Sequence, residues 1–85
     1  MKNSIIIIED DKKINDLICN LLKSEYTIYQ SFDGKDGLSL IFANNIDVII
    51  LDLGLPDMDG MEVIDKIIIS PSIKCFNYIR FKAPS

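Results

Sequence analysis

Two short segments rich in isoleucine, each followed at once by an acidic residue, constrain the fold of this chain more than any other feature. The first covers residues 4–8 and leads into Glu9, and the second covers residues 47–51 and leads into Asp52. Nearly unbroken β-branched runs of this length are typical of strands buried on both faces of a parallel sheet. Parallel strands need a long crossover connection, usually a helix. The two segments therefore predict an α/β fold.

The segments between these strands carry the expected helices. Residues 12–24 predict a helix, and we expect its apolar face in the core: Ile14, Leu17, Ile18, Leu21 and Leu22. Residues 26–31 predict a strand and residues 35–43 a weaker helix. Residues 61–69 predict a third helix with an apolar face of Met61, Ile64, Ile67 and Ile68. This alternation implies right-handed crossovers and a doubly wound parallel sheet.

The end of the chain has a less regular pattern. Residues 73–81 alternate in a way that permits a strand, but neither face of that strand is clearly apolar. We therefore expect residues 1–69 to form the core of the domain and residues 70–85 to form a divergent tail. If residues 73–81 cross back over the third helix, the tail adds a fourth strand at the sheet edge.

Length and composition exclude several classes of protein. The chain has 85 residues, enough for one small domain, and its 48% hydrophobic content excludes a disordered chain. A net charge of -4 without histidine argues against direct nucleic-acid binding. No apolar run approaches the roughly 20 residues of a membrane span, and the first apolar run is too short for a secretory signal. We expect a cytoplasmic protein in which Cys19 and Cys75 are free thiols.

Acidic residues follow both central strands of the predicted sheet. The carboxyl ends of parallel strands open onto one crevice, so neighbouring first and third strands would bring Glu9, Asp10 and Asp52 together. Carboxylates at that separation repel one another unless a cation neutralises them, and Mg²⁺ prefers oxygen ligands. A carboxylate beside such an ion can accept a phosphoryl group, and Asp52 is the best candidate. We interpret Asp11 as a helix N-cap, and Asp57 and Asp59 as turn residues.

Three motifs give the chain a resemblance to a known family. These are IIIIEDD over residues 5–11, Asp33-Gly34, and DVIILDLGLPDMDG over residues 47–60. Over residues 2–69 the chain resembles the receiver domain of bacterial two-component response regulators. The resemblance implies a flavodoxin-like sheet of order 2-1-3, extended by strand 4 if the tail pairs. It also implies that Asp52 is the phosphoacceptor, that Glu9, Asp10 and the Gly54 carbonyl hold Mg²⁺ with Asp52, and that a sensor histidine kinase supplies most of the catalysis.

The chain departs from that family after residue 69. The family has a Ser or Thr at the end of its fourth strand and a Lys at the end of its fifth, and we assign neither role to Ser70, Ser72, Lys74 or Arg80. We therefore expect a truncated, switch-impaired relay module rather than an enzyme, without the DNA-binding domain that often follows a receiver. Codon degeneracy permits the tail to be a frameshift product. Exposed apolar surface left by the missing elements predicts a homo-oligomer.

Two other functions start from the same sheet. A flavodoxin-like domain could bind a phosphorylated cofactor such as a flavin nucleotide, but the chain lacks a Gly-rich or Ser/Thr-rich phosphate loop. A Mg²⁺-dependent phosphatase would need a second Asp two residues after the first, where this chain has Gly54. The receiver-like relay module is therefore the favoured prediction.

Overall fold

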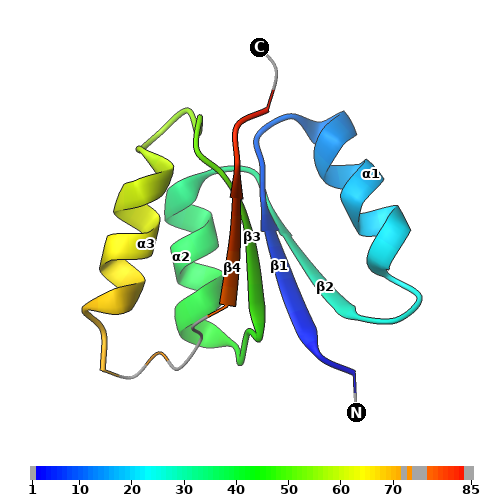
Figure 1. Cartoon of the computed structure of the whole chain (residues 1–85), viewed down its shortest axis with the longest axis horizontal. Coiled ribbons are helices and arrows are strands. Elements are labelled where there is room, and N and C mark those ends of the chain that lie inside the picture. The colour runs from blue at the N-terminus through cyan, green and yellow to red at the C-terminus, as the bar shows by residue number, and fades with distance from the viewer. Residues whose placement is uncertain (1, 72, 74–76, 84–85) are drawn as a thin grey trace.

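The chain forms a four-stranded parallel sheet with helices on both faces. A computed structural model describes residues 2–71, 73 and 77–83. Its elements are β1 (Ser4–Ile8), α1 (Lys12–Leu22), β2 (Thr27–Ser31), α2 (Gly34–Ala43), β3 (Val48–Asp52), α3 (Gly60–Ile68) and β4 (Asn77–Phe81). The strand order is β2-β1-β3-β4, and every neighbouring pair is parallel. In Figure 1, α2 and α3 cover one face of the sheet and α1 lies on the other. The predicted α/β class and the 2-1-3 order are confirmed, with β4 added beside β3.

Aspartate side chains cap the N-termini of all three helices in the described part of the chain. Asp11 Oδ1 accepts the backbone N–H groups of Lys13 and Ile14, at 2.9 and 3.2 Å. Asp33 and Asp59 cap α2 and α3 in the same way. Each cap satisfies N–H groups that have no partner within the first helical turn. The predicted N-cap role of Asp11 is therefore confirmed.

The main core lies between the sheet and the pair α2 and α3. Ile6 and Ile8 of β1 belong to this cluster, together with Ile41, Leu51 and Val63. Successive strand side chains point to opposite faces, so Ile5 and Ile7 face α1. All four isoleucines of β1 are buried. The prediction of a first strand buried on both faces is confirmed.

The predicted apolar face of the first helix is wrong in part. Leu17 and Leu21 are 59% and 71% exposed, whereas Asn15 is fully buried. In the described part of the chain α1 is the only helix on its face of the sheet, so nothing covers the outer half of its apolar stripe. In α3, likewise, Met61 and Ile68 lie at the exposed margin, and Val63 and Ile67 point inward. Helical periodicity shows where the apolar stripe of a helix lies, but it does not show which elements pack against that stripe and bury it.

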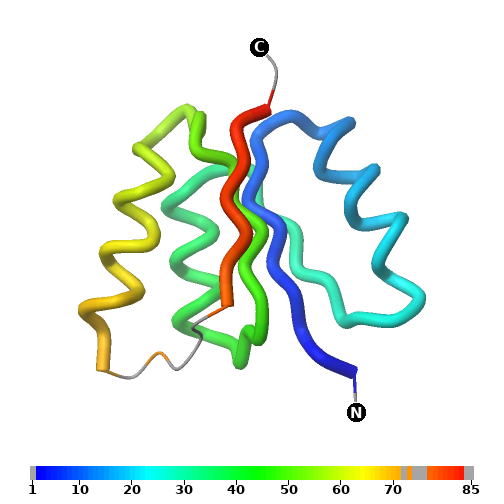
Figure 2. Tube along the Cα trace, viewed as in Figure 1, coloured from blue at the N-terminus to red at the C-terminus, as the bar shows by residue number. Residues whose placement is uncertain are grey.

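The strand β4 lies at one edge of the sheet, beside the inner strand β3. It pairs with β3 from Val48↔Asn77 to Asp52↔Phe81, and Figure 2 shows its course alongside β3. Its residues are largely exposed, as the lack of an inner face in the sequence indicated. Ser72, Lys74 and Cys75 lie outside the described residues, and Cys19 is a half-buried free thiol. Within the described residues, no helix has the length and hydropathy needed to cross a membrane.

Candidate functional site

Three carboxyl groups meet at the carboxyl edge of the sheet. Glu9 and Asp10 follow β1, and Asp52 ends β3, which pairs with β1 through Ile8↔Leu51. One carboxylate oxygen from each of the three lies within 4.8 Å of the other two. The two strand-end motifs, more than forty positions apart in the sequence, are therefore neighbours because the sheet pairs β1 with β3. The structure brings together the three acids that the sequence singled out.

The carboxyl group of Glu9 lies in an environment that disfavours its charged form. Its side chain is fully buried, and that desolvation, together with the neighbouring Asp52 and Asp10, raises its pKa to about 7. The backbone N–H of Asp11 donates to Glu9 Oε2 at 3.1 Å and opposes this shift. Among the described residues, Oε1 of Glu9 is buried with no hydrogen-bond partner. A buried carboxylate oxygen without a partner is unstable unless a proton or a cation reaches it.

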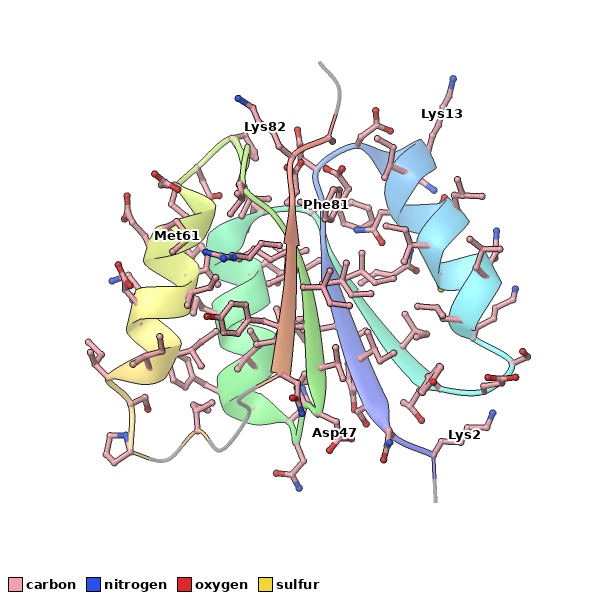
Figure 3. The ribbon with its side chains drawn as sticks, viewed as in Figure 1. Lys2, Lys13, Asp47, Met61, Phe81 and Lys82 are labelled. Atoms are coloured by element: carbon pink, nitrogen blue, oxygen red, sulfur yellow. The ribbon has the colours of Figure 1, made fainter. Side chains whose placement is uncertain are left out.

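Asp52 is held by backbone groups from two separate segments. It is 2% exposed, and its Oδ1 accepts the N–H of Gly54 at 2.9 Å and the N–H of Ala83 at 3.3 Å. Ala83 follows β4, so the tail itself contributes to the site. The sequence analysis missed this contact, because a backbone amide leaves no mark in the residue type. Figure 3 shows the neighbouring Phe81 and Lys82 at the same end of the sheet.

This donor set fits a small divalent cation. The unpartnered Oε1 of Glu9 and the close approach of three acidic side chains provide oxygen ligands and negative charge at one point. Asp10 is exposed, so the site opens to water on that side. Mg²⁺ binds through a few carboxylates and keeps several waters, as such a site allows. The contact that Gly54 makes here is through its N–H, and its carbonyl remains a predicted ligand.

Gly60 allows the loop after Asp52 to close tightly. A Cβ atom at Gly60 would lie 2.8 Å from the Leu53 Cα and 2.9 Å from the Asp52 carbonyl oxygen. These are backbone atoms, which cannot move aside as a flexible side chain can. The missing side chain of Gly60 lets α3 begin directly against the end of β3. Residue 60 therefore fixes the path of the loop that leaves the candidate site.

Asp57 joins the same loop to α2. Its carboxylate accepts the N–H groups of Gly34 at 2.8 Å and Lys35 at 2.9 Å. These backbone hydrogen bonds lower the pKa of Asp57. The interpretation of Asp57 as a local turn residue missed this contact, which spans more than twenty positions in the sequence. Asp59 likewise acts as the cap of α3, where its Oδ1 accepts the N–H of Met61 at 3.0 Å.

The chain is similar to known proteins in both sequence and fold. The chain matches the family model described as response regulator receiver domain over residues 5–75. It is similar to the response regulator TrrA from Thermotoga maritima in complex with Mg²⁺-BeF, with 34% identity and a TM-score of 0.73, over 79% of this chain and 58% of that one. A structure of the histidine kinase ThkA in complex with TrrA matches with 31% identity and a TM-score of 0.81, over 100% of this chain and 72% of that one.

A third match is the signal receiver domain of a DNA-binding response regulator from Colwellia psychrerythraea. It has 28% identity and a TM-score of 0.86, over 99% of this chain and 71% of that one. Against the first TrrA structure, at 58%, this chain spans less than two thirds of its relative's length.

Proposed function

The chain belongs to the response regulator receiver domain family, and from that premise we propose that it accepts a phosphoryl group on Asp52 in a two-component phosphorelay. The observation that carries the proposal is the cluster of Glu9, Asp10 and Asp52 at the carboxyl edge of the sheet. In this proposal Asp52 is the phosphoacceptor. Glu9, Asp10, Asp52 and the Gly54 carbonyl hold Mg²⁺. The Mg²⁺-BeF complex of the relative TrrA supports Mg²⁺ as the cation, and the acidic cluster of this chain supports the choice of ligands.

In this proposal each residue of the site has a separate role in phosphoryl transfer. When held by these residues, Mg²⁺ would supply positive charge that offsets the negative charge on the phosphoryl oxygens. Asp52 Oδ1 is held by the Gly54 and Ala83 amides, and these contacts fix the orientation of its carboxylate. A carboxylate oxygen of Asp52 would form a bond to the phosphorus of the donor's phosphoryl group while the bond between that phosphorus and the donor breaks, and the donor would leave with the electron pair of the broken bond. Glu9 and Asp10 add the negative charge that draws the cation to this edge.

The donor in this proposal is a sensor histidine kinase, as in the complex of TrrA with ThkA. The chain is then a phosphoacceptor, while the kinase supplies most of the catalysis. We also propose that the chain is cytoplasmic, because a kinase takes the phosphoryl group from ATP, which it finds in the cytoplasm. Neither nucleic acid nor a membrane is a direct partner in this proposal, in keeping with the net charge of -4. A flavin site is disfavoured, because acids occupy the crevice where a phosphate would bind.

We also propose that the conformational response is impaired. The resemblance implies a Ser or Thr hydroxyl at the end of the fourth strand, whereas β4 ends at Phe81 and is followed by Lys82. No hydroxyl at this position can then report the state of Asp52 to the surface. The chain would accept the phosphoryl group but transmit its presence poorly.

Mg²⁺ titration tests the metal part of the proposal. We expect weak, saturable Mg²⁺ binding that shifts the backbone NMR resonances around Glu9 and Asp52. Asp10→Asn and Asp52→Asn should each weaken binding by about tenfold or more, because each removes one anionic ligand. Asp59→Asn, which keeps a good helix cap, is the matched control. Unchanged binding in both site variants would remove the metal site from the proposal.

We propose that copies of the chain associate. Leu17, Leu21 and Ile79 are large, apolar and more than half exposed. Ile79 lies on β4, which forms one edge of the four-stranded sheet in the described part of the chain. At that edge, the exposed Ile79 favours pairing with a second copy or exchange of the tail. Leu17 and Leu21 add exposed apolar surface on α1, which packs on β1 and β2.

Light scattering over a range of protein concentrations measures this association. We expect a dimer or larger oligomer at high concentration, and Ile79→Lys should shift the chain toward monomer because it places a charge beside the edge. Ile69→Lys changes an isoleucine that is still more exposed than Ile79 and that caps the C-terminus of α3, away from β4, and it serves as the control. A monomeric mass at every concentration, or equal effects of both variants, would refute the edge as the interface.

A further inference from the structure

We propose that Asn15 is a positioning residue that holds the end of β1, and with it the carboxylate of Glu9, in the geometry that the metal requires. This inference rests on the proposed function and extends it. No part of that proposal uses Asn15, which lies on α1 and contributes no ligand atom. Its side chain acts on the site through the backbone.

The amide of Asn15 joins the ends of two strands. Its Nδ2 donates to the carbonyl of Glu9 at 2.9 Å and to the carbonyl of Ser31 at 2.8 Å. Both amide hydrogens are thereby used, one on the residue after β1 and one on the last residue of β2. The sheet adds a third link at the same place, since the Glu9 N–H donates to the Ser31 carbonyl at 3.0 Å. Glu9 is therefore fixed at both of its backbone polar groups.

The orientation of the Asn15 amide is itself fixed. Gln30 Nε2 donates to Asn15 Oδ1 at 2.9 Å and to Asp16 Oδ1 at 2.9 Å. The amide nitrogen faces the two carbonyls with or without Gln30, because the amide oxygen in its place would meet two acceptors. The Gln30 bond satisfies the oxygen on the other side. The backbone N–H of Asn15 also donates to the Asp11 carbonyl at 2.9 Å, so the helix start is tied to the same residue. Asn15 thus contacts the chain on both sides of Asp10.

The burial of Asn15 suggests a specific role for its side chain. Burying an amide costs free energy unless the amide is hydrogen-bonded. Asn15 is fully buried on the face of α1 that meets the sheet, where an apolar residue would pack without desolvating an amide. Glu9 in turn is buried beside Asp10 and Asp52, with a carboxylate oxygen of each within 4.8 Å of the others, and ionised groups this close repel one another. Holding the backbone of Glu9 at two points resists displacement by this repulsion. Loss of the Asn15 side-chain hydrogen bonds should therefore displace the Glu9 carboxylate while the domain remains folded.

The test compares Asn15→Leu with Gln30→Leu. Asn15→Leu is close in size but removes both bonds to the carbonyls. Gln30→Leu breaks the same polar network yet leaves those two bonds in place. Mg²⁺ affinity, measured by NMR titration, should fall about tenfold or more in Asn15→Leu, the usual effect of losing a group that orients a ligand. It should change less than twofold in Gln30→Leu. Equal affinities in the two variants would overturn the proposal.

A double-mutant cycle asks whether Asn15 acts through Glu9. In a Glu9→Gln background the Asn15→Leu change should have little further effect on Mg²⁺ affinity, because the group it positions is already altered. Fully additive losses would show that Asn15 influences the site by another route, and would overturn the proposal. If Asn15→Leu does not fold, as judged by circular dichroism, Asn15→Ser retains one donor and should give a smaller loss in the same direction.

A metal-free measurement separates this inference from the proposed function. The Asp11 N–H is bonded to Glu9 Oε2, so its hydrogen-exchange protection reports where the Glu9 carboxylate lies. We expect that protection to fall in Asn15→Leu and to persist in Gln30→Leu. If the wild-type chain does not bind Mg²⁺, the metal site is refuted. The hydrogen-exchange protection of the Asp11 N–H still tests whether Asn15 positions Glu9, because that measurement needs no metal. Unchanged Asp11 protection in Asn15→Leu would refute the positioning role.

Discussion

Asp52→Asn is expected to abolish labelling of this chain by a small acyl phosphate or by a histidine kinase. Asparagine keeps the size of the side chain and its contacts with the Gly54 and Ala83 amides, but its amide cannot take up a phosphoryl group as a carboxylate does. Phosphate incorporation, followed by intact-protein mass spectrometry with Mg²⁺ present, should fall to background. Circular dichroism should show that the fold is retained.

Asp59→Asn is the matched control for this experiment. It makes the same chemical change in the same loop, at a residue that caps α3 and contributes no oxygen to the acidic cluster. It should therefore label like the wild-type chain. We expect wild-type labelling to be slow and poorly retained, since within the described residues β4 ends without the hydroxyl that the family uses to stabilise the phosphoryl group, and no strand follows it to carry the family's Lys. Undiminished labelling of Asp52→Asn would show that another residue is the acceptor.

The second large effect is a loss of stability as pH rises in the absence of divalent cations. The pKa of Glu9 is raised from 4.5 to about 7, so the folded chain holds a proton that the unfolded chain has released. This stabilising contribution is fully present below pH 4.5 and is lost as pH rises through 7. The shift corresponds to about 3 kcal/mol, of which about 2 to 3 kcal/mol is lost between pH 5 and pH 8.

Urea unfolding in chelator at pH 5 and pH 8 measures this contribution. The wild-type chain should lose stability over that interval, and Glu9→Gln should lose much less because its side chain does not titrate. Mg²⁺ should stabilise the wild-type chain at pH 8 and have little effect at pH 5, where Glu9 is protonated. A wild-type chain whose stability is the same at both pH values, or a Glu9→Gln variant with the same pH dependence, would contradict the assignment.

Much of the architecture could be predicted from local patterns. The isoleucine runs at β1 and β3 indicated strands buried on both faces, and the alternation with helices indicated their parallel order. Because parallel strands share one carboxyl edge, the positions of Glu9, Asp10 and Asp52 after those strands were enough to predict their meeting. Helix caps such as Asp11 are equally local, since a carboxylate there bonds to amides two or three residues away.

The tertiary structure decided which groups complete and orient the site. Helical periodicity placed Leu17 and Leu21 on an inner face, but how far a stripe is buried depends on what packs against it, and there Asn15 points inward instead. Two hydrogen bonds join segments that are distant in the sequence. The Ala83 N–H donates to Asp52, and the Gly34 N–H at the start of α2 donates to Asp57. Such contacts depend on the path of the backbone through the whole fold, and the types of the residues involved do not reveal that path. The sequence by itself therefore determined which acids meet, because strand pairing follows from local pattern. Only the folded chain determined how they are held, because backbone amides and buried polar side chains act through long-range geometry.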